Sequence, residues 1–445
     1  MNKTKSPVLW WSIIVSLGGL LFGFDTAVIS GVEQSIQQLF QLSDLMHGFT
    51  IATALIGTII GSFTSGYPAD KYGRKPMLFI IAVLFMVSAI GSALSTTILQ
   101  FIIFRLLGGL SIGASSVVAP MYISEISPAK VRGRMTMLFQ FNIVFGITIA
   151  FFSNYLLRDT GANPWRWMLG VESVPALLYL ILLFMIPRSP RFLIKIGKMD
   201  EALKVLSRVE PGDIKRRTEE IQASFQNNVI KEKLFVRKYS KPILIAFLVA
   251  FFNQTTGING ILYYAPRIIE NTGLAGSTSM QQAIAIGFTN LVFTFVAVNL
   301  IDRVGRKRLL LIGSVGTFIF LALTASAFFQ NNFSGYNIVL YLMGFVAFFA
   351  ISSGAVIWVL IAEVFPNSVR GKGQGLGSGT HWALAALITY LLPFAVESDT
   401  IGGGMTFAFF AAMTFIQFFV VWRIFPETKG KSLEELEKEL VKKRK

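Results

Sequence analysis

Long apolar segments recur along the whole chain and alternate with short polar loops. A helix that spans a membrane needs about 20 mostly apolar residues. Twelve segments of that kind can be read from the sequence: 9–30, 48–69, 77–95, 99–121, 135–156, 167–187, 242–269, 281–301, 308–328, 336–361, 372–394 and 403–425. The pattern predicts an all-α membrane protein with twelve transmembrane helices in two six-helix bundles.

One long polar stretch, from Arg188 to Lys241, separates the two sets of apolar segments. Inside it, MDEALKVLSRVE and DIKRRTEEIQ have the spacing of short amphipathic helices at a membrane surface. The pattern divides the chain into an N-terminal bundle, a cytoplasmic linker, a C-terminal bundle and a cytoplasmic tail, over 1–187, 188–241, 242–425 and 426–445. The first apolar segment lacks a small-residue cleavage site, so we interpret it as a span and not as a signal peptide.

Lysine and arginine collect in alternate loops. Cytoplasmic loops are enriched in these residues, and the basic regions include the central linker, Lys3, Lys5, Lys130 and the final KKRK. The opposite loops are nearly free of them, the exceptions being Arg158, Arg166 and Arg267. We therefore expect a multi-pass protein of the cytoplasmic (inner) membrane, with the lipid bilayer as its surroundings and both termini in the cytoplasm.

Composition excludes several other classes of protein. Hydrophobic residues make up 53% of the chain and charged residues 14%, against about 25% charged in a soluble domain. The net charge of +16 is dispersed through loops, which argues against nucleic-acid binding. The chain has no cysteine, and His47 and His381 are far apart, so neither a metal site nor another cofactor is expected. No nucleophile, base and orienting group occur in an arrangement typical of an enzyme.

An internal repeat is visible in the basic loops. DKYGRK at 70–75 recurs as DRVGRK at 302–307, and Glu125 with RGR at 132–134 recurs as Glu363 with RGK at 370–372. Orientation alone would need only scattered lysine and arginine, whereas acid, glycine and base recur here at matched spacing. The repeat predicts a cytoplasmic charge network in each half, formed by Asp70, Arg74, Glu125, Arg132, Asp302, Arg306, Glu363 and Arg370.

Together with PRSPRF at 187–192 and PETKG at 426–430, these loops resemble the sugar porter family of the major facilitator superfamily. Supporting stretches are GFDTAVISG at 23–31, QTTGINGILYYAP at 254–266 and WVLIAEVFPNSVRGKG at 358–373. The resemblance covers essentially the whole chain and is closest to the bacterial proton:xylose and proton:galactose symporters. One departure is Arg188, which stands where the family usually has a glutamate.

Several amide side chains lie inside the apolar segments, where exposure to lipid would be costly. They are Gln140, Asn253, Gln254, Asn259 and Asn290. A monosaccharide is a ring of hydroxyls with apolar faces, so it needs amides at fixed directions and an aromatic plane. Hydrogen bonding between helices is the alternative role for such amides. Gly257 lies among them and can let the seventh span break or bend.

The resemblance assigns roles to these positions. It implies that Gln140, Gln254 and Asn259 bind the sugar, with Asn253 replacing a glutamine. Trp358 and Trp382 match tryptophans at the sugar, for which packing or an interfacial position is the alternative. His381 stands where relatives often have glutamine or asparagine, and its imidazole can hydrogen-bond a hydroxyl. The remaining matched positions are the gate residues Tyr263 and Tyr264.

Asp25 is an acid inside the first span, where an ionised carboxylate is expensive and its presence points to function. Arg105 in the fourth span is its natural partner. An acid caught between burial and a nearby arginine takes up or releases a proton when the arginine moves. The resemblance implies proton coupling at Asp25, tuned by Glu172 in the sixth span. A static buried ion pair is the alternative.

The sequence therefore predicts proton-coupled symport of a pentose or hexose by alternating access, through a monomer. Facilitated uniport, with Asp25 only structural, is one alternative. A sugar sensor is another, although sensors commonly carry a long cytoplasmic tail and only about twenty residues follow the last predicted span here.

Overall fold

The computed structural model describes residues 7–128, 131–209, 212, 214–226, 233–273, 276–333, 336–366, 368–431 and 433–441. Lys3, Lys5, Lys130 and the final KKRK, which contributed to the predicted orientation, lie outside these described residues.

Twelve helical segments of the described chain are long and apolar enough to cross a membrane. They are Val8–Gly31, Asp44–Thr64, Arg74–Leu94, Ile98–Ile126, Arg132–Leu157, Pro164–Met185, Arg237–Tyr263, Thr278–Val304, Arg306–Phe329, Asn337–Glu363, Arg370–Glu397 and Gly402–Ile424. Each coincides with a predicted segment, so the predicted all-α class and the number of spans are confirmed.

The chain forms two compact units, and the first contains residues 1–28, 53–153 and 157–228. Its helices are α1 (Val8–Val28), most of α3 (Asp44–Thr64), α4 (Gly66–Tyr72), α5 (Arg74–Leu94), α6 (Ile98–Ile126), α7 (Arg132–Leu157), α8 (Pro164–Gly170), α9 (Ser173–Leu182), η2 (Leu183–Met185), α10 (Pro190–Lys195), α11 (Met199–Val209) and α12 (Ile214–Gln226). Within this unit α5 packs along α6, and α1 packs between α6 and α9.

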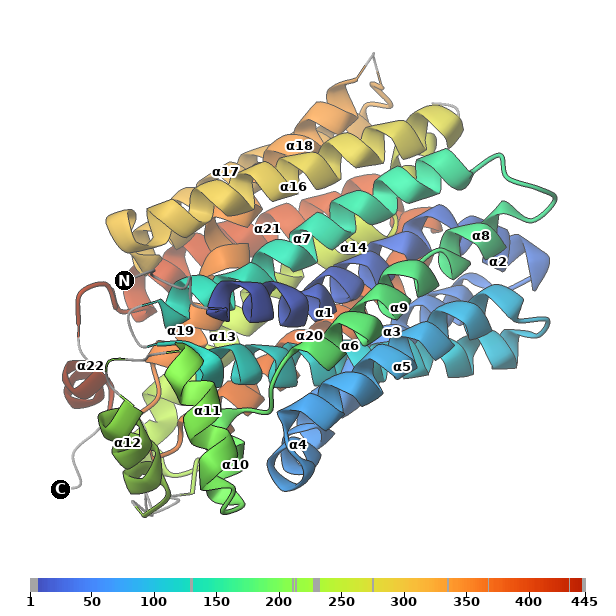
Figure 1. The fold of residues 1–445 in the computed structure, drawn as a ribbon. Helices are drawn as coiled ribbons and strands as arrows, with labels where there is room; N and C mark the ends of the chain where they lie inside the picture. Colours follow the sequence, from blue (N-terminus) through green and yellow to red (C-terminus); the bar gives the residue numbers. More distant parts are fainter. Residues whose placement is uncertain are drawn as a thin grey trace. The chain divides into compact units, whose positions relative to one another are not determined.

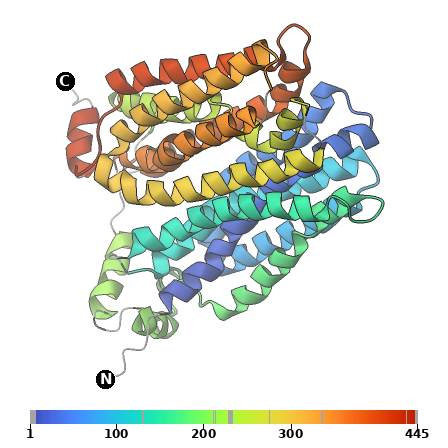
Figure 2. The same cartoon turned by 90° about the horizontal axis from the view of Figure 1, so that it is seen from above.

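Three short helices of the first unit, α10, α11 and α12, pack against one another in both views (Figure 1 and Figure 2). They occupy the polar stretch in which two amphipathic helices were predicted, and α11 buries the apolar face formed by Ala202, Val205, Leu206 and Val209. Those two helices are confirmed as α11 and α12. The division of the chain into bundle, linker, bundle and tail stays a prediction.

The second unit contains residues 29–52, 154–156 and 229–445. Its helices are η1 (Ile29–Gly31), α2 (Glu33–Leu39), the first part of α3, η3 (Arg237–Tyr239), α13 (Ser240–Thr255), α14 (Ile258–Tyr263), α15 (Ala265–Glu270), α16 (Gly276–Val304), α17 (Arg306–Phe329), α18 (Asn337–Phe349), η4 (Ala350–Gly354), α19 (Ala355–Glu363), α20 (Arg370–Glu397), α21 (Gly402–Ile424) and α22 (Leu433–Leu440). Here α17 packs against both α18 and α21.

Two spans of the second unit are interrupted. The seventh breaks between α13 and α14 at Gly257, whose φ of 81° lies in the left-handed region that glycine adopts without strain. The tenth passes from α18 through the π-helical segment η4 into α19. Interruptions of this kind free backbone carbonyls and often mark functional sites. Both interruptions lie beside residues that were predicted to bind the solute.

Candidate functional site

A buried ion pair joins α1 to α6 in the first unit. Arg105 donates from Nη1 to Asp25 Oδ1 and from Nη2 to the Asp25 carbonyl oxygen, the latter at 3.3 Å. Both side chains are almost inaccessible, at 1% and 2% exposure. Glu172, the residue before α9, is equally buried and interacts electrostatically with Asp25 and Arg105. Two acids and one base therefore share one apolar site.

The packing around this pair leaves room for the second oxygen of Asp25. A Cβ atom on Gly108 would lie 3.2 Å from Asp25 Oδ2 and 2.5 Å from Ser88 Oγ, so glycine allows α6 to approach both groups. Among the described residues, Asp25 Oδ2 and Glu172 Oε1 have no hydrogen-bond partner.

A chain of amides lies at the break of the seventh span, in the second unit. Asn259 Nδ2 donates to Gln254 Oε1 at 2.9 Å, and Gln254 Nε2 donates to Asn253 Oδ1 at 2.9 Å. Asn253 Nδ2 then donates to the Ser353 carbonyl oxygen in η4 at 3.0 Å. The break at Gly257 brings Asn259 back toward Gln254, because a continuous helix would separate residues five apart by more than one turn.

Ser353 and Gln417 were not among the predicted residues. Gln417 on α21 donates from Nε2 to Ser353 Oγ at 3.2 Å, and both side chains are buried. The sequence signal was available, since a glutamine inside an apolar span is as costly as the amides that were selected. Gln417 was missed because it lies outside the motifs that carry the family resemblance.

Three aromatic side chains cluster beside the amides. His381 stacks obliquely on Trp358, with ring centroids 4.8 Å apart, and meets Trp382 edge-on at 4.7 Å. Gln254 Nε2 lies 3.2 Å from each ring nitrogen of His381. The arrangement joins hydrogen-bonding amides to flat apolar surfaces, as recognition of a sugar ring requires.

The two tyrosines predicted as a gate follow the amides along the chain. Tyr263 ends α14, and Tyr264 separates α14 from α15. Both are buried, and the Tyr264 hydroxyl donates to the Thr389 carbonyl oxygen of α20 at 3.3 Å. Burial and the nearby Glu33 carboxylate both raise the pKa of Tyr264 well above its usual range, so the phenol stays neutral.

Two predicted solute residues stand apart from these clusters. Asn290 is buried on α16, and its Oδ1 accepts from Thr294 at 3.4 Å. No side-chain hydrogen bond among the described residues links Asn290 to Gln254. Gln140 lies on α7 and is half-buried in the first unit. The structure thus assembles most of the predicted solute residues of the second unit into one cluster but leaves Asn290 outside it.

The predicted cytoplasmic charge network of the first unit forms around Arg74. Its Nη2 atom lies 2.9 Å from Asp70 Oδ1 and 2.8 Å from Glu125 Oε1. The Arg74 Nη1 atom donates to the Ala69 carbonyl oxygen at 3.1 Å, and Ser189 Oγ donates to Glu125 Oε2. We call Asp70, Arg74, Glu125 and Ser189 the first-unit charge cluster. It connects α4 and α5 to the end of α6.

The second unit repeats this arrangement around Arg306. Arg306 lies 3.1 Å from both Asp302 Oδ1 and Glu363 Oε1, and its Nη1 donates to the Ile301 carbonyl oxygen at 3.1 Å. Thr428 Oγ1 donates to Glu363 Oε2 at 2.6 Å. We call Asp302, Arg306, Glu363 and Thr428 the second-unit charge cluster. The glycines before Arg74 and Arg306 share φ of 101°, so the backbone repeats as closely as the side chains.

The two hydroxyls reveal a third repeated motif that the sequence comparison missed. Pro-Arg-Ser at 187–189 occupies the place of Pro-Glu-Thr at 426–428. Glu427 accepts from the backbone nitrogens of Arg306 at 3.0 Å and Lys307 at 3.2 Å, at the start of α17. Arg188 is exposed and places a positive charge beside Lys75 at the start of α5.

The remaining two predicted network residues begin helices. Arg132 is the first residue of α7, and Arg370 is the first residue of α20. Arg370 Nε donates to the Phe365 carbonyl oxygen at 3.3 Å. The repeated positions in the sequence therefore have repeated positions in the fold.

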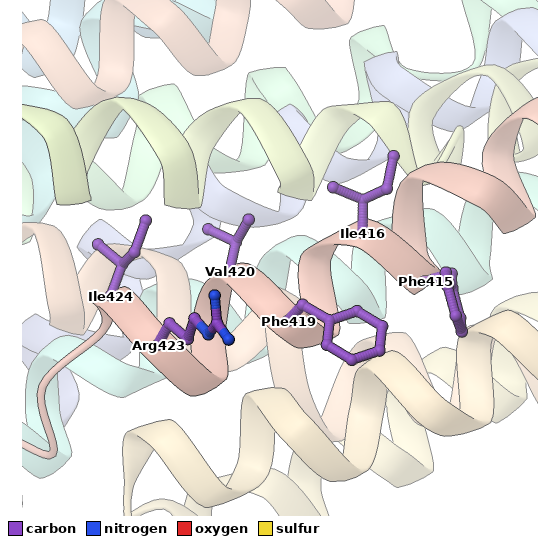
Figure 3. Close-up of a pocket in the computed structure, with 6 residues that line it drawn as sticks. All are labelled: Phe415, Ile416, Phe419, Val420, Arg423 and Ile424. Carbon is purple, nitrogen blue, oxygen red and sulfur yellow. The ribbon is translucent and has the colours of Figure 1, made fainter.

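Two surface grooves of the second unit are lined by other residues. The groove in Figure 3 has a volume of about 270 Å³ and lies along α21, between apolar side chains and Arg423. A second, of about 570 Å³, is lined by Arg237 and by apolar residues that include Phe235 and Phe247. Neither contains a predicted solute residue. Across the described chain, no group of three His, Cys, Asp or Glu side chains is placed to hold a metal ion.

Comparison with known proteins identifies the family. Residues 11–440 match the family model described as sugar (and other) transporter. The arabinose-proton symporter of Bacillus subtilis is 37% identical over 99% of this chain and 97% of its own length. A glucose transport protein of Synechocystis is also 37% identical, over 98% of this chain and 100% of its length. The inward-open structure of the Escherichia coli xylose transporter has a TM-score of 0.87 and 33% identity, covering 97% of this chain and 100% of that one.

Proposed function

The chain belongs to the sugar transporter family, the sugar porters of the major facilitator superfamily, and we propose that it carries a monosaccharide into the cell together with a proton. Transport proceeds by alternating access, in which the solute site opens to one side of the membrane and then to the other. Family membership makes the protein a transporter and not an enzyme.

The observation that carries the proposal is the buried Asp25, Arg105 and Glu172 site. An ion pair that served only to hold helices would need one acid and one base. A second acid next to the pair creates a position where a proton can be held or released, depending on the distance to Arg105. Glu172 supports coupling over the static alternative for this reason.

The sugar site of the proposal is the cluster of amides and aromatic rings in the second unit. Asn253, Gln254 and Asn259 supply the hydrogen-bonding groups, and Trp358 with Trp382 supply apolar planes. His381 contributes a further hydrogen-bonding nitrogen. We further propose that Gln140, from its match to the family motif, and Asn290, as an amide inside a span, contact the sugar. Tyr263 and Tyr264, also matched to the family, close the site from the outside.

The surroundings of the protein are part of the proposal. Basic residues collect in the loops on the side of the two charge clusters, so we place those clusters, the short helices α10 to α12 and both termini in the cytoplasm. The membrane is the cytoplasmic (inner) membrane. We propose a monomer, because two repeated halves within one chain form a complete transporter.

Uptake into proteoliposomes tests the proposal. Purified protein is reconstituted, and a panel of radiolabelled pentoses, hexoses and inositol is offered with and without an inward proton gradient. We expect one sugar to accumulate above its external concentration only with the gradient, and the accumulated sugar to leave when a protonophore is added. Liposomes without protein provide the background.

Two other outcomes would contradict parts of the proposal. Equilibration of a sugar at the same rate with and without the gradient would identify a uniporter, with Asp25 as a structural residue. Absence of transport for every sugar in the panel, with protein that is folded and correctly inserted, would remove the monosaccharide as substrate.

A further inference from the structure

Gln417 on α21 is a buried amide that neither the proposed sugar site nor the proposed proton site uses. It lies on the buried face of α21, together with Phe407, Phe410, Thr414 and Val421. The hydroxyl of Thr414 donates to the Ala411 carbonyl oxygen of its own helix at 2.8 Å. The Gln417 amide instead reaches another span, where it donates to Ser353 Oγ at 3.2 Å. An amide inside a span is costly, so a contact of this kind points to a function.

Ser353 connects two helices through two different atoms. Its hydroxyl accepts from Gln417 on α21, and its carbonyl oxygen accepts from Asn253 Nδ2 on α13 at 3.0 Å. The preceding residue, Ser352, behaves differently, because its hydroxyl donates to the Phe348 carbonyl oxygen of its own span at 2.6 Å. Serine hydroxyls in helices commonly make that local bond. Ser353 is therefore held from both sides within the π-helical segment η4.

The hydrogen bonds continue from Asn253 to the sugar amides. Gln254 donates to Asn253, and Asn259 donates to Gln254, both at 2.9 Å. We call Gln417, Ser353, Asn253, Gln254 and Asn259 the amide chain. The first four are at most 4% exposed, whereas Asn259 is half-buried. The amide chain thus runs from the interior at Gln417 to a partly accessible end at Asn259.

The same face of α21 also supports the break in the seventh span. Phe410 lies seven residues before Gln417, which is about two helical turns. A Cβ atom on Gly257 would lie 2.4 Å from Phe410 Cε2, so the phenyl ring packs directly on the break. In addition, α13 packs against both η4 and α21. The ring of Phe410 supports the backbone at the break, and Gln417 supports the amides beside it.

Holding one group of an amide fixes the directions of its other groups. Each amide side chain has two N–H groups and two oxygen lone pairs, and each amide of the chain uses at least one of them on a neighbour. A site that hydrogen-bonds a hydroxyl rejects an analogue that leaves the group unpaired. That rejection weakens when the amide can turn to follow a displaced hydroxyl.

We propose that Gln417 is a positioning residue of the sugar site. Through Ser353 it fixes Asn253, and thereby the directions in which Gln254 and Asn259 offer their hydrogen bonds. The amide chain thus sets how sharply the protein distinguishes one sugar from another, a consequence that rests on the proposed function. Without Gln417, the Ser353 hydroxyl is free to turn to its own span, as that of Ser352 does, and α21 no longer holds the carbonyl that anchors Asn253.

A simple tie between helices is the alternative role for Gln417, because hydrogen bonds between spans also stabilise a bundle. Such a tie would change stability and leave the preference among sugars unchanged. Pairs of sugars that differ only in the direction of one hydroxyl separate the two roles. D-xylose with L-arabinose, and D-glucose with D-galactose, are such pairs.

Initial uptake rates into proteoliposomes measure KM and kcat for both pairs. Gln417→Met keeps the length of the side chain without its amide, and Ser353→Ala removes the hydroxyl but keeps the carbonyl that Asn253 uses. We expect each variant to raise KM for the preferred sugar about threefold, at the low end of the contribution of one hydrogen bond, with kcat unchanged. The preference for that sugar over its epimer should fall by a similar factor.

The double variant tests whether Gln417 acts through Ser353. Two residues that act through one contact are not additive, so the double variant should show no larger change than either single one. Thr414→Val is the matched control, since Thr414 is buried on the same face of α21 and bonds within its helix. It should keep the KM and sugar preference of wild type. Ser353→Ala is a small change that should fold even where Gln417→Met does not.

Hydrogen exchange of the full-length protein in detergent tests the positioning without any need for transport. Mass spectrometry follows peptides that cover η4 and the break, where the Gly257 nitrogen donates to the Gln254 carbonyl oxygen at 2.9 Å. We expect protection at the break to fall about threefold in Gln417→Met, in Ser353→Ala and in the double variant alike, because one hydrogen bond is lost in each. Thr414→Val should keep the protection of wild type.

The outcomes separate this proposal from the proposed function. Unchanged protection at the break in both single variants would overturn the positioning role even if sugar is transported. An equal rise in KM for both members of a pair, or additive effects in the double variant, would overturn it as well. The expected exchange pattern in a protein that transports no sugar would establish the positioning of the amides and reject the proposed function.

Discussion

The two charge clusters show how closely the two halves repeat, and where they differ. Arg74 and Arg306 each pair with an acid four residues earlier and with an acid at the end of another helix, at 2.8 to 3.1 Å in every case. A hydroxyl, from Ser189 or Thr428, supports the second acid in both. The repeat fails at one residue: Glu427 caps α17, and Arg188 stands in its place beside α5.

The interiors of the halves differ much more than their loops. The first unit buries two acids and an arginine at Asp25, Arg105 and Glu172, whereas the second buries neutral amides and aromatic rings around Gln254. The loop motif is thus common to both halves, whereas the proposed proton site and most of the proposed sugar site lie in different interiors.

The largest effect is expected from removing the central arginine of a charge cluster. Arg74→Gln leaves Glu125, which is 7% exposed, without its cation, and losing one partner of a buried pair costs about 3–5 kcal/mol. Glu363 is 23% exposed, so Arg306→Gln should destabilise the protein by less than half as much. Thermal unfolding in detergent measures both, with the exposed Lys71→Gln as control. Equal losses of stability in Arg74→Gln and Arg306→Gln would show that the burial of the acid does not set the cost of removing its arginine.

The next largest effect is expected on sugar accumulation, from replacing Asp25 in the interior of the first unit. A membrane potential of 100 mV supplies about 2.3 kcal/mol per coupled charge, which corresponds to about fiftyfold accumulation. We expect Asp25→Asn to lose this accumulation and to retain sugar exchange at equal concentrations, because the sugar amides are unchanged. Proteoliposome uptake and counterflow measure the two activities. Asp159→Asn, an exposed acid, is the control, and accumulation by Asp25→Asn would reject coupling at this residue.

A smaller effect is expected from the amides of the second interior. Gln254→Ala removes a hydrogen-bonding group from the proposed sugar site, which should cost about 1.4 kcal/mol, or tenfold in the KM for sugar. Sugar uptake by Gln254→Ala should still depend on the proton gradient. Asp25→Asn should show the reverse, with unchanged sugar binding and no dependence on the gradient. Initial uptake rates across sugar concentrations give KM. Gln330→Ala, in the loop between the predicted ninth and tenth spans, serves as control. A variant that lost the gradient dependence as well would contradict the division between the interiors.

The smallest effect tests the one position where the clusters differ. An acid at the start of a helix contributes about 0.5–1 kcal/mol through backbone hydrogen bonds and the helix dipole. We expect Arg188→Glu to stabilise the protein by that amount, by capping α5 and removing a positive charge near Lys75. Glu427→Gln should destabilise it by a similar amount. Thermal unfolding measures both, and destabilisation by Arg188→Glu would show that the two caps are not equivalent.

Much of the fold could be predicted because its signals are local. The twelve spans follow from the length of apolar segments, and α11 and α12 follow from amphipathic spacing, since either pattern is fixed by residues within one or two dozen positions. The two repeated loop motifs were readable for the same reason. The pairing of Asp25 with Arg105 could be predicted because each is a charge inside an apolar segment, and the structure places them in contact.

Other features depended on which helices pack together. The match between Pro-Arg-Ser and Pro-Glu-Thr is only three residues long. It is recognisable from the structure because Ser189 and Thr428 donate hydrogen bonds to equivalent acids, Glu125 and Glu363. Ser353 belongs to the amide cluster because its carbonyl oxygen, in the π-helical segment, accepts a hydrogen bond from Asn253. No sequence pattern predicts that contact.

The character of each segment, as a span, a surface helix, a basic loop or a tight glycine turn, follows from its own residues. Which polar groups come into contact depends on how the helices pack. One example is Glu33, which lies 2.6 Å from His47 and 2.9 Å from Arg267, while Arg267 also pairs with Glu397. These four residues come from four segments spread over more than three hundred residues, and each alone is an ordinary residue near a helix end. Hydrophobic burial is set residue by residue, whereas a hydrogen bond requires two particular atoms within about 3 Å, and that distance exists only after the helices have packed.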